Sequence, residues 1–360
     1  MSHLFVDSHE DIAYNIYCFG RDYSTSAKQI RINEQNSETP DWVGDATLGW
    51  LDWKKANTVM VCCTLFSMSK RYERGAWEIV GYKNLNEAQK ILMAEIDIYR
   101  RLEGDFPDKF SIIHSKKQIE PLWQAALRGE DHPIGLVISM EGAEGIRSPE
   151  AIEFWWEQGV RIVGPVWAGG RFCGGTIERG GFTNEGRQLL SIMADLGMGL
   201  DLAHMTEESA LEALDRYEGE IIASHVNVRS LLKGIDSERH FTDRTIRRLA
   251  ERGGVMSVVP LNFFLITNWT KFSPRDKVTI SHLADQIDAI CQITGSANHV
   301  GIGTDFDGGY GYPEIPLEFN TIADIQKLSS TLTERGYSEA DIKKIFGENV
   351  KSALERILPE

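Results

Sequence analysis

The sequence lacks the cysteine pattern of a disulfide-stabilised protein. Its 360 residues include five cysteines, an odd number, and no two of them form a Cys-x-x-Cys pair. Small secreted domains that depend on disulfides usually contain an even number of cysteines at regular spacing. We therefore expect free thiols and a reducing, cytoplasmic location.

Positive charge and long apolar runs are also scarce. Lys and Arg number 38 against 53 Asp and Glu, which gives a formal net charge of −15. Because nucleic acids and anionic membrane surfaces bind to basic faces, we expect neither as a partner. No apolar run approaches the length of a membrane span. The first apolar run begins at residue 4 and the C-terminus carries no hydrophobic anchor signal, so we expect neither a signal peptide nor a lipid anchor.

What the sequence does contain is a regular alternation of short apolar runs and amphipathic segments. Eight apolar runs lie near residues 5, 61, 137, 163, 200, 222, 257 and 301. Segments with helical spacing of apolar residues lie between them, for example at residues 78–102, 184–196, 243–251 and 281–294. Strands that alternate with helices form parallel sheets, and eight such repeats predict an α/β protein with a closed (β/α)8 TIM barrel. A doubly wound open sheet is the alternative fold.

The length and the absence of a linker favour one barrel domain over residues 1–360. Residues 14–52 are polar and rich in Ser, Thr, Asn and Asp, so we expect an irregular insertion there. Residues 110–114 are expected to form a short extra strand, and residues 322–358 a helical C-terminal segment.

Side chains that can bind metal ions follow five of the eight apolar runs. His9 and Asp11 follow the first run two residues apart, so they project from the same face of a strand. Four other runs end at Glu141, His204, His225 and Asp305. Each residue alone has an ordinary structural explanation, such as a turn or a buried polar contact. In a barrel, however, all strand ends meet on one face, and imidazole with carboxylate is a common donor set for metals.

The motifs around these residues resemble the renal (membrane) dipeptidase family. They are Ser8-His9-Glu10-Asp11, Met140-Glu141-Gly142, Leu202-Ala203-His204, Ser224-His225 and the segment from Gly301 to Asp307. The resemblance extends over nearly the whole chain. The family consists of binuclear zinc peptidases of the metal-dependent amidohydrolase superfamily.

The resemblance implies a ligand set for two divalent metal ions per chain, with zinc as the expected element. His9 and Asp11 match the ligands of one ion, and His204 and His225 match those of the other. Glu141 matches the carboxylate that bridges the two. Members of the family are often homodimers, so a homodimer is an expected assembly.

The resemblance also implies catalytic and substrate-binding roles. Asp305 matches a carboxylate that handles the proton of the metal-bridging hydroxide, and Arg239 matches an arginine that binds the terminal carboxylate of the substrate. Trp167 stands where better-known members have a substrate-binding histidine, so we expect it either to line the pocket or to pack under the following glycine-rich loop. Arg171 in that loop is an expected substitute donor.

The expected function is that of a metallo-dipeptidase. It would hydrolyse a small dipeptide by a metal-bridging hydroxide and tolerate a D-residue at the C-terminal position. Another amidohydrolase activity, on an N-acyl amino acid or a lactam, is the alternative among enzymes. A catalytically silent metal-binding protein is the alternative outside them. Asp305 favours an enzyme, because a pure binder gains nothing from a placed proton carrier.

Overall fold

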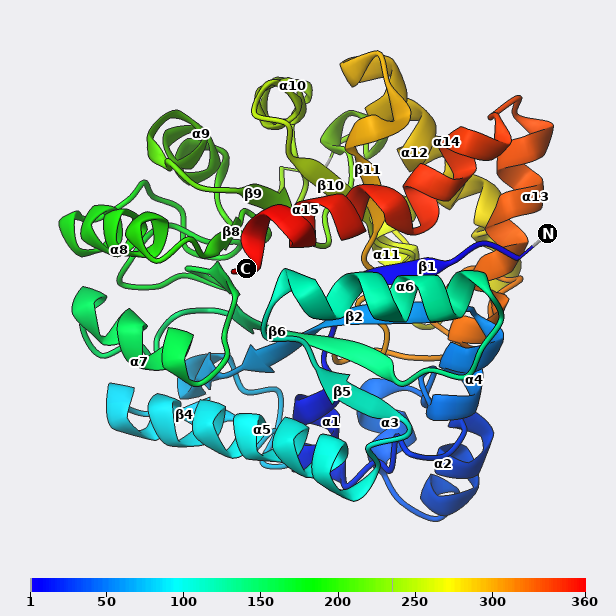
Figure 1. Ribbon diagram of the computed structural model, residues 1–360, viewed down its shortest axis with the longest axis horizontal. Helices are drawn as coiled ribbons and strands as arrows, with labels where there is room; N and C mark the ends of the chain where they lie inside the picture. Colours follow the sequence, from blue (N-terminus) through cyan, green and yellow to red (C-terminus); the bar gives the residue numbers. More distant parts are fainter. Residues whose placement is uncertain (1, 235) are drawn as a thin grey trace.

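Eight parallel strands form a closed ring surrounded by helices, as a computed structural model that describes residues 2–234 and 236–360 shows (Figure 1). The ring contains β1 (Phe5–Glu10), β2 (Thr58–Phe66), β6 (Ile134–Glu141), β7 (Ile162–Gly164), β8 (Gly199–Asp201), β9 (Ile221–Ala223), β10 (Val255–Val258) and β11 (Val300–Ile302). These are the eight apolar runs of the sequence. The predicted (β/α)8 barrel is therefore confirmed.

The order of the strands around the ring is β1, β11, β10, β9, β8, β7, β6 and β2. The pairing of β2 with β6 extends over seven residue pairs, from Met60–Gly135 to Phe66–Glu141. The expected extra strand is β5 (Phe110–Ile112), which pairs with the first residues of β6 on the edge that β7 occupies further along. In this order β2 lies diametrically across the ring from β9.

Helices cover the outside of the ring and one of its ends. The outer helices are α5 (Leu85–Asp105), α7 (Ile152–Glu157), α8 (Asn184–Asp195), α9 (Glu207–Arg216), α10 (Asp243–Glu251) and α12 (Ile280–Thr294). The short α11 (Asn262–Leu265) instead lies in the loop after β10. The side chains of Thr183, Thr206 and Thr242 cap α8, α9 and α10 by accepting hydrogen bonds from backbone N–H groups. The helix expected from residue 78 begins only at Leu85, because the side chain of Asn84 caps it.

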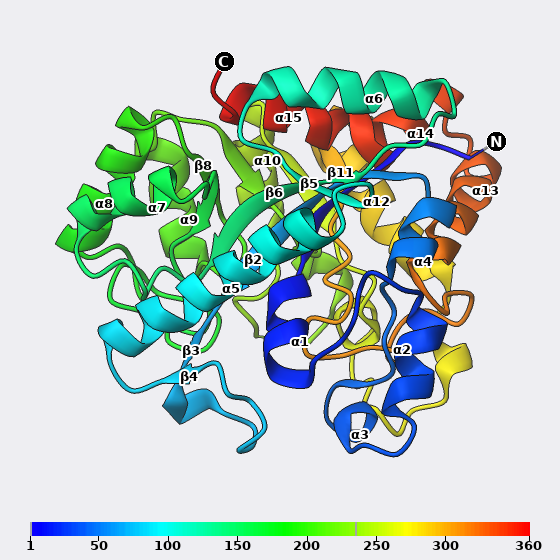
Figure 2. The ribbon, with the colours of Figure 1, turned by 60° about the horizontal axis from the view of Figure 1, so that its bottom comes forward.

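The C-terminal segment closes the end of the barrel at which the strands begin. It comprises η7 (Ile322–Gln326), α13 (Lys327–Glu334), α14 (Glu339–Lys343), η8 (Lys344–Glu348) and α15 (Asn349–Ile357). The apolar face of α15 packs with strand residues such as Val6, Ile162 and Val255, beside α6 (Ile119–Leu127) (Figure 2). The opposite end of the barrel, where the strands finish, is left for loops. None of the helices in the described ranges has the length and apolarity needed to cross a bilayer.

The expectation of an irregular insertion at residues 14–52 is wrong, because much of this stretch is helical. It contains most of α1 (Ile12–Phe19), then α2 (Ala27–Glu34), α3 (Thr39–Val43) and the start of α4 (Trp50–Lys55). Helices this short show little periodicity in a sequence and depend on tertiary packing. Here the side chains of Ile30 and Trp53 are buried in the main core, and Ser26 caps α2.

The buried carboxylate of Asp307 ties this helical insertion to the loop after β11. It accepts hydrogen bonds from Tyr23 Oη at 2.8 Å and from both N and Oγ1 of Thr47 at 2.7 Å. The guanidinium of Arg21 lies 3.3 Å away. Every one of these partners is a hydrogen-bond donor or a cation, which suits a carboxylate at this position.

We expect Asp307→Asn to destabilise the protein strongly. The amide keeps the shape, but it removes one of the two carboxylates that face Arg21 and turns an NH2 group toward donors. Breaking a buried ion pair costs about 3–5 kcal/mol, which denaturant unfolding measures. The exposed Asp276→Asn is the control. Equal stability of the two variants would show that Asp307 does not hold the insertion in place.

Candidate active site

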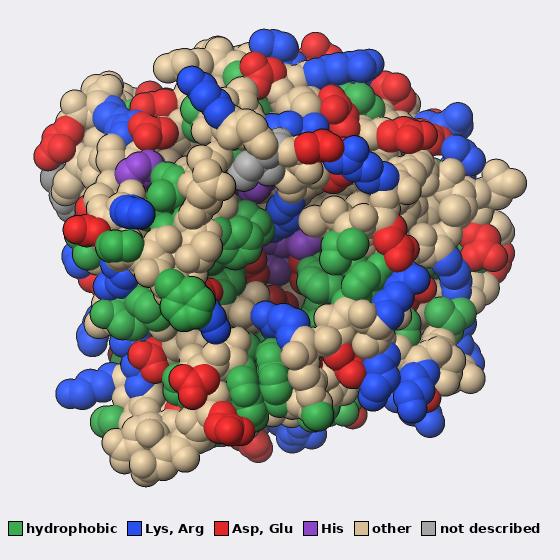
Figure 3. Space-filling view, turned by 180° about the vertical axis from the view of Figure 1, so that it is seen from behind, with side chains coloured by type: hydrophobic (Ala, Val, Ile, Leu, Met, Phe, Trp, Pro, Cys, Tyr) green, Lys and Arg blue, Asp and Glu red, His purple; other side chains and the backbone are tan. Residues whose placement is uncertain are grey.

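A cavity of about 680 Å³ opens where the barrel strands end. Residues that follow all eight strands of the ring line it. Figure 3 shows the opening, with histidine side chains in its depth and hydrophobic side chains around it. Substrate sites of (β/α)8 enzymes lie at this end of the barrel.

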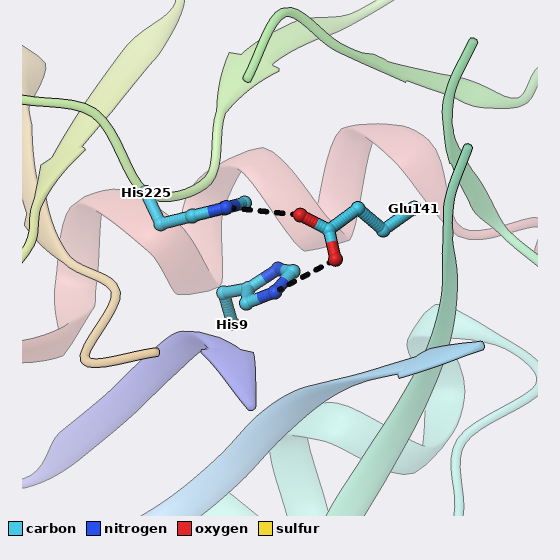
Figure 4. Close-up of side chains that lie close together, drawn as sticks. All are labelled: His9, Glu141 and His225. Atoms are coloured by element: carbon cyan, nitrogen blue, oxygen red, sulfur yellow. Dashed lines mark ion pairs between the residues drawn. The ribbon is translucent and has the colours of Figure 1, made fainter. Parts of the chain in front are cut away.

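Glu141, at the end of β6, lies between three histidines at the bottom of the cavity. Its Oε1 is 2.8 Å from Nε2 of His204 and 3.2 Å from Nε2 of His225. Its Oε2 faces the other way and is 3.8 Å from Nε2 of His9 (Figure 4). One carboxylate thus presents Oε1 to a first group of side chains, His204 and His225, and Oε2 to a second group that includes His9.

The second group consists of residues from β1 and β11. Nε2 of His9 is 4.0 Å from Oδ2 of Asp11 and 3.8 Å from Oδ1 of Asp305. One ligand atom from each of these three residues lies within 4.8 Å of the others, and the same holds for His9, Glu141 and His225. The structure therefore brings together all six strand-end residues that the sequence singles out.

Backbone conformation at the strand ends helps to bring these groups together. His204 and Asp305 have φ values of +67° and +53°, a left-handed conformation that residues other than glycine rarely adopt. Asp7 holds the second of these turns, because its carboxylate accepts hydrogen bonds from N and Oγ1 of Thr304. The backbone N–H of Asp305 in turn donates to the carbonyl of His9 at 3.1 Å. The ends of β1 and β11 are thereby held side by side.

Hydrogen bonds at the outer nitrogen atoms hold the rings of two histidines, and those of His225 also define its tautomer. Ser224 Oγ donates its only proton to Asp201 Oδ2, so at 2.7 Å it accepts from Nδ1 of His225. Thr176 Oγ1 lies 2.9 Å from Nδ1 of His204 and 3.3 Å from the carbonyl oxygen of the same residue. The ring of His225 therefore carries its proton on Nδ1 and points the lone pair of Nε2 toward Glu141, as metal-binding histidines do.

The electrostatics of the cluster fit divalent cations. Burial, followed by the charge of Arg239, lowers the pKa of His9 to about 3, so the ring is neutral. Burial also lowers the pKa of His204 and His225 well below the usual range. It raises the pKa of Glu141 well above its usual range, and the nearby charge of Asp305 adds to this rise. A divalent cation would reverse this penalty on the ionised carboxylates.

The surroundings of the buried ligand atoms also suit metal ions. Nε2 of His204 and Nε2 of His225 lie 3.0 Å apart, and both face Oε1 of Glu141. Nε2 of His9 and Oδ1 of Asp11 are buried and have no hydrogen-bond partner in the described parts of the chain. Buried polar atoms are rarely left in this state unless an ion or water binds them. The residues present therefore suit a pair of metal ions.

Arg239 lies in the loop after β9 and lines the same cavity. Its side chain is buried, and neither Nη1 nor Nη2 donates a hydrogen bond to any described residue. The guanidinium instead stacks 4.8 Å from the ring of Phe264. Next to it, Glu238 accepts a hydrogen bond from the N–H of Glu207 at 2.9 Å and pairs with Arg229, which holds the loop against α9. The result is a positioned cation whose donors are free for a ligand.

Trp167 lines the cavity rather than lying beneath the glycine-rich loop. Its half-buried indole packs edge-on against Phe66, with ring centres 5.2 Å apart, and lies 6.1 Å from the ring of His204. Arg171, by contrast, donates to the carbonyl of Ile146 and pairs with Glu185. The expectation that Arg171 serves as a donor in the pocket is therefore wrong.

Several residues that line the cavity were not anticipated from the sequence. They are Tyr14, Arg74, Glu78 and Tyr310. Arg74 donates to Glu78, to Tyr14 Oη and to the carbonyl of Gly309, so it joins the loops after β1, β2 and β11. These residues lie well beyond the strand ends, in segments without periodicity. A cluster of aromatic residues near the ends of β1 and β2 was the only signal in the sequence.

Comparison with known proteins agrees with this geometry. The sequence pattern of the membrane dipeptidases (peptidase family M19) matches residues 2–357. The chain belongs to this family. The resemblance in the motifs is thereby confirmed over nearly the whole chain.

Individual relatives are distant. A protein of Klebsiella pneumoniae, described as an uncharacterized protein in the pqqA 5' region, is 28% identical over 238 residues, covering 63% of this chain and 84% of that protein. An uncharacterized dipeptidase of Schizosaccharomyces pombe is 29% identical over 276 residues, covering 73% of this chain and 62% of that protein. A solved metallopeptidase of Rhodobacter sphaeroides, bound to a phosphinate mimic of L-Ala-D-Ala, superposes with a TM-score of 0.79 at 21% identity, covering 99% of this chain and all of the other. At this identity the likeness establishes the shared fold.

We expect the purified protein to hold two divalent ions per chain, as counted by elemental analysis. A chelator should lower its thermal midpoint, and zinc should restore it, because an ion that binds only the folded state adds about 4 kcal/mol at a thousandfold excess over its Kd. Glu141→Gln should reduce occupancy at both positions, whereas the exposed Glu130→Gln should not. Loss of only one ion in Glu141→Gln would mean that this carboxylate is not shared.

Proposed function

We propose that the protein is a metal-dependent dipeptidase that hydrolyses small dipeptides with a free C-terminal carboxylate. The observation that carries this proposal is the buried, unpaired guanidinium of Arg239 in the same cavity as the cluster around Glu141. A cation held at a fixed place beside a two-metal cluster suits a short substrate that ends in a carboxylate.

The residues divide the work of amide hydrolysis. Two divalent ions, with zinc as the proposed element, would be held by His9 and Asp11, by His204 and His225, and by the shared carboxylate of Glu141. When bound there they supply a water activated at neutral pH and polarise the scissile carbonyl.

Asp305 is the proposed carrier of the proton. It lines the cavity beside the cluster, and burial raises its pKa well above the usual range, with the nearby charge of Asp11 adding to the rise. A carboxyl group with a raised pKa can accept a proton from the attacking water and pass it to the amine that leaves.

Arg239 defines which end of the substrate binds where. Its two Nη atoms offer a bidentate site for the C-terminal carboxylate, which places the scissile amide over the cluster. We also propose tolerance of a D-residue at the C-terminal position, supported by the L-Ala-D-Ala mimic bound to the Rhodobacter sphaeroides protein. N-acyl amino acids and lactams with a free carboxylate satisfy the same site and are the second candidate substrates.

The deciding experiment is hydrolysis of a dipeptide library by the zinc-loaded protein, with N-acyl amino acids and lactams assayed in parallel. Release of free amino acids from dipeptides is the expected result. Turnover of the other amides alone would reassign the protein to another amidohydrolase activity. Zinc binding without turnover of any substrate would identify a silent metal-binding protein.

We expect Asp305→Asn to reduce kcat by about a hundredfold or more, the usual scale of general acid–base contributions. The amide retains the shape of the side chain but cannot accept and return the proton. Circular dichroism and metal content should stay close to those of the parent, with Asp276→Asn as the matched surface control. Near-normal turnover would show that Asp305 does not carry the proton.

Arg239→Ala should weaken catalysis mainly for substrates with a free C-terminus. A charge-assisted hydrogen bond contributes about 1.5–3 kcal/mol. The activation free energy derived from kcat/KM should therefore rise by that amount for a dipeptide and change little for the dipeptide amide. Arg239→Lys keeps the charge but not the bidentate geometry and should recover part of the loss. Equal losses on the dipeptide and its amide would refute the role of Arg239 in carboxylate binding.

A further inference from the structure

The wall of the cavity opposite Arg239 is made of aromatic and other apolar side chains. We name these residues the aromatic wall: Tyr14, Phe66, Met68, Tyr72 and Trp167. The ring of Phe66 packs edge-on against the rings of Tyr14 and Trp167, at 5.8 and 5.2 Å between centres. Tyr72 packs edge-on against Trp167 at 6.1 Å. These contacts form one continuous apolar surface.

The strand order places the aromatic wall at the far end of a bound dipeptide. Arg239 follows β9, and most of the wall follows β1 and β2, with β2 diametrically across the ring from β9. The cluster around Glu141 lies between them at the bottom of the cavity. A dipeptide with its carboxylate at Arg239 and its amide over the cluster therefore directs its N-terminal residue toward the wall.

The two charged residues that contact the aromatic wall at Tyr14 pair with each other. Arg74 donates to Glu78 from Nε at 3.1 Å and from Nη2 at 2.6 Å. Its Nη groups also contact Tyr14 Oη at 3.2 Å and the carbonyl of Gly309 at 3.0 Å. A charged substrate side chain would have to break these contacts or lose its water without compensation. An apolar side chain has no charge to desolvate and breaks none of these hydrogen bonds.

The size of the cavity also exceeds the need of a minimal substrate. Its volume of about 680 Å³ lies within the range of roughly 300–1,000 Å³ that holds drug-sized ligands. A small side chain such as that of alanine would leave the partly exposed rings of Tyr72 and Trp167 in contact with water. A large side chain would remove that apolar surface from water and gain binding energy in proportion to the area covered.

We propose that the preferred substrates carry a large apolar side chain, aromatic or branched aliphatic, on the N-terminal residue, which packs on the aromatic wall. This inference rests on the proposed dipeptidase function and on the orientation that Arg239 imposes. It names the substrate class and assigns specificity at the N-terminal position to Phe66, Met68 and Trp167.

The test compares kcat/KM for Phe-Gly, Leu-Gly, Ala-Gly, Glu-Gly and Lys-Gly with the zinc-loaded enzyme. Glycine at the second position removes stereochemistry from the comparison. Phe-Gly and Leu-Gly should exceed Ala-Gly by about tenfold or more, the scale at which a hydrophobic pocket discriminates, and the two charged substrates should rank below Ala-Gly. Equal values across the series, or a preference for Glu-Gly, would overturn the inference while leaving the dipeptidase function intact. No hydrolysis of any dipeptide would instead refute the proposed function.

Variants of the wall locate the effect. Met68→Gln preserves length but adds an amide, and the ratio of kcat/KM for Phe-Gly to that for Ala-Gly should fall about tenfold. Measurable hydrolysis of Ala-Gly by the same preparation shows that the variant folds. Trp167→His, at a half-exposed position, is the second variant and should lower the same ratio. Phe272→Ser, at an 86% exposed side chain away from the cavity lining, is the matched control and should keep the ratio of the parent. An unchanged ratio in the wall variants would refute the assignment.

Discussion

Three carboxyl groups and three imidazole rings meet at one point inside this barrel, and the two oxygens of Glu141 stand between the rings. Ionising these buried carboxylates costs several kcal/mol each, unless an opposite charge compensates. The neutral histidines cannot supply that charge, and Arg239 supplies only one. Bound cations would stabilise the ionised carboxylates, so metal binding and folding stability are expected to be coupled.

Buried aspartates outside the cluster hold its members in position. Asp7 accepts from the backbone of Thr304 and thereby joins β1 to β11. Asp201 accepts from the N–H of Ser224 and from its hydroxyl, which joins β8 to β9 and orients the ring of His225. Asp307 joins the loop after β11 to the helical insertion. Each of these carboxylates crosses a boundary between elements, so neighbouring strand ends cannot shift independently.

Different physical signals explain which parts could be predicted from the sequence. The strands are buried on both faces, so they appear as apolar runs, and a polar residue such as His204 at the end of a run is conspicuous. Arg239 lies in an irregular loop, and only the resemblance to a family singled it out. The short helix α3 and the contact between Trp167 and Phe66 depend on tertiary packing, which leaves no periodic pattern in the sequence.

In the proposed function, the division between strand ends and loops would separate chemistry from specificity. The six residues of the cluster lie at or directly after strands, where backbone hydrogen bonds to both neighbours restrict movement. The aromatic wall is built mainly on the segments after β1 and β2, and Arg74 joins these segments to the loop after β11. Changes in the wall are therefore expected to leave the histidines in place. Conversely, a change at Asp7 or Asp201 would disturb the residues of the cluster, although neither aspartate lines the cavity.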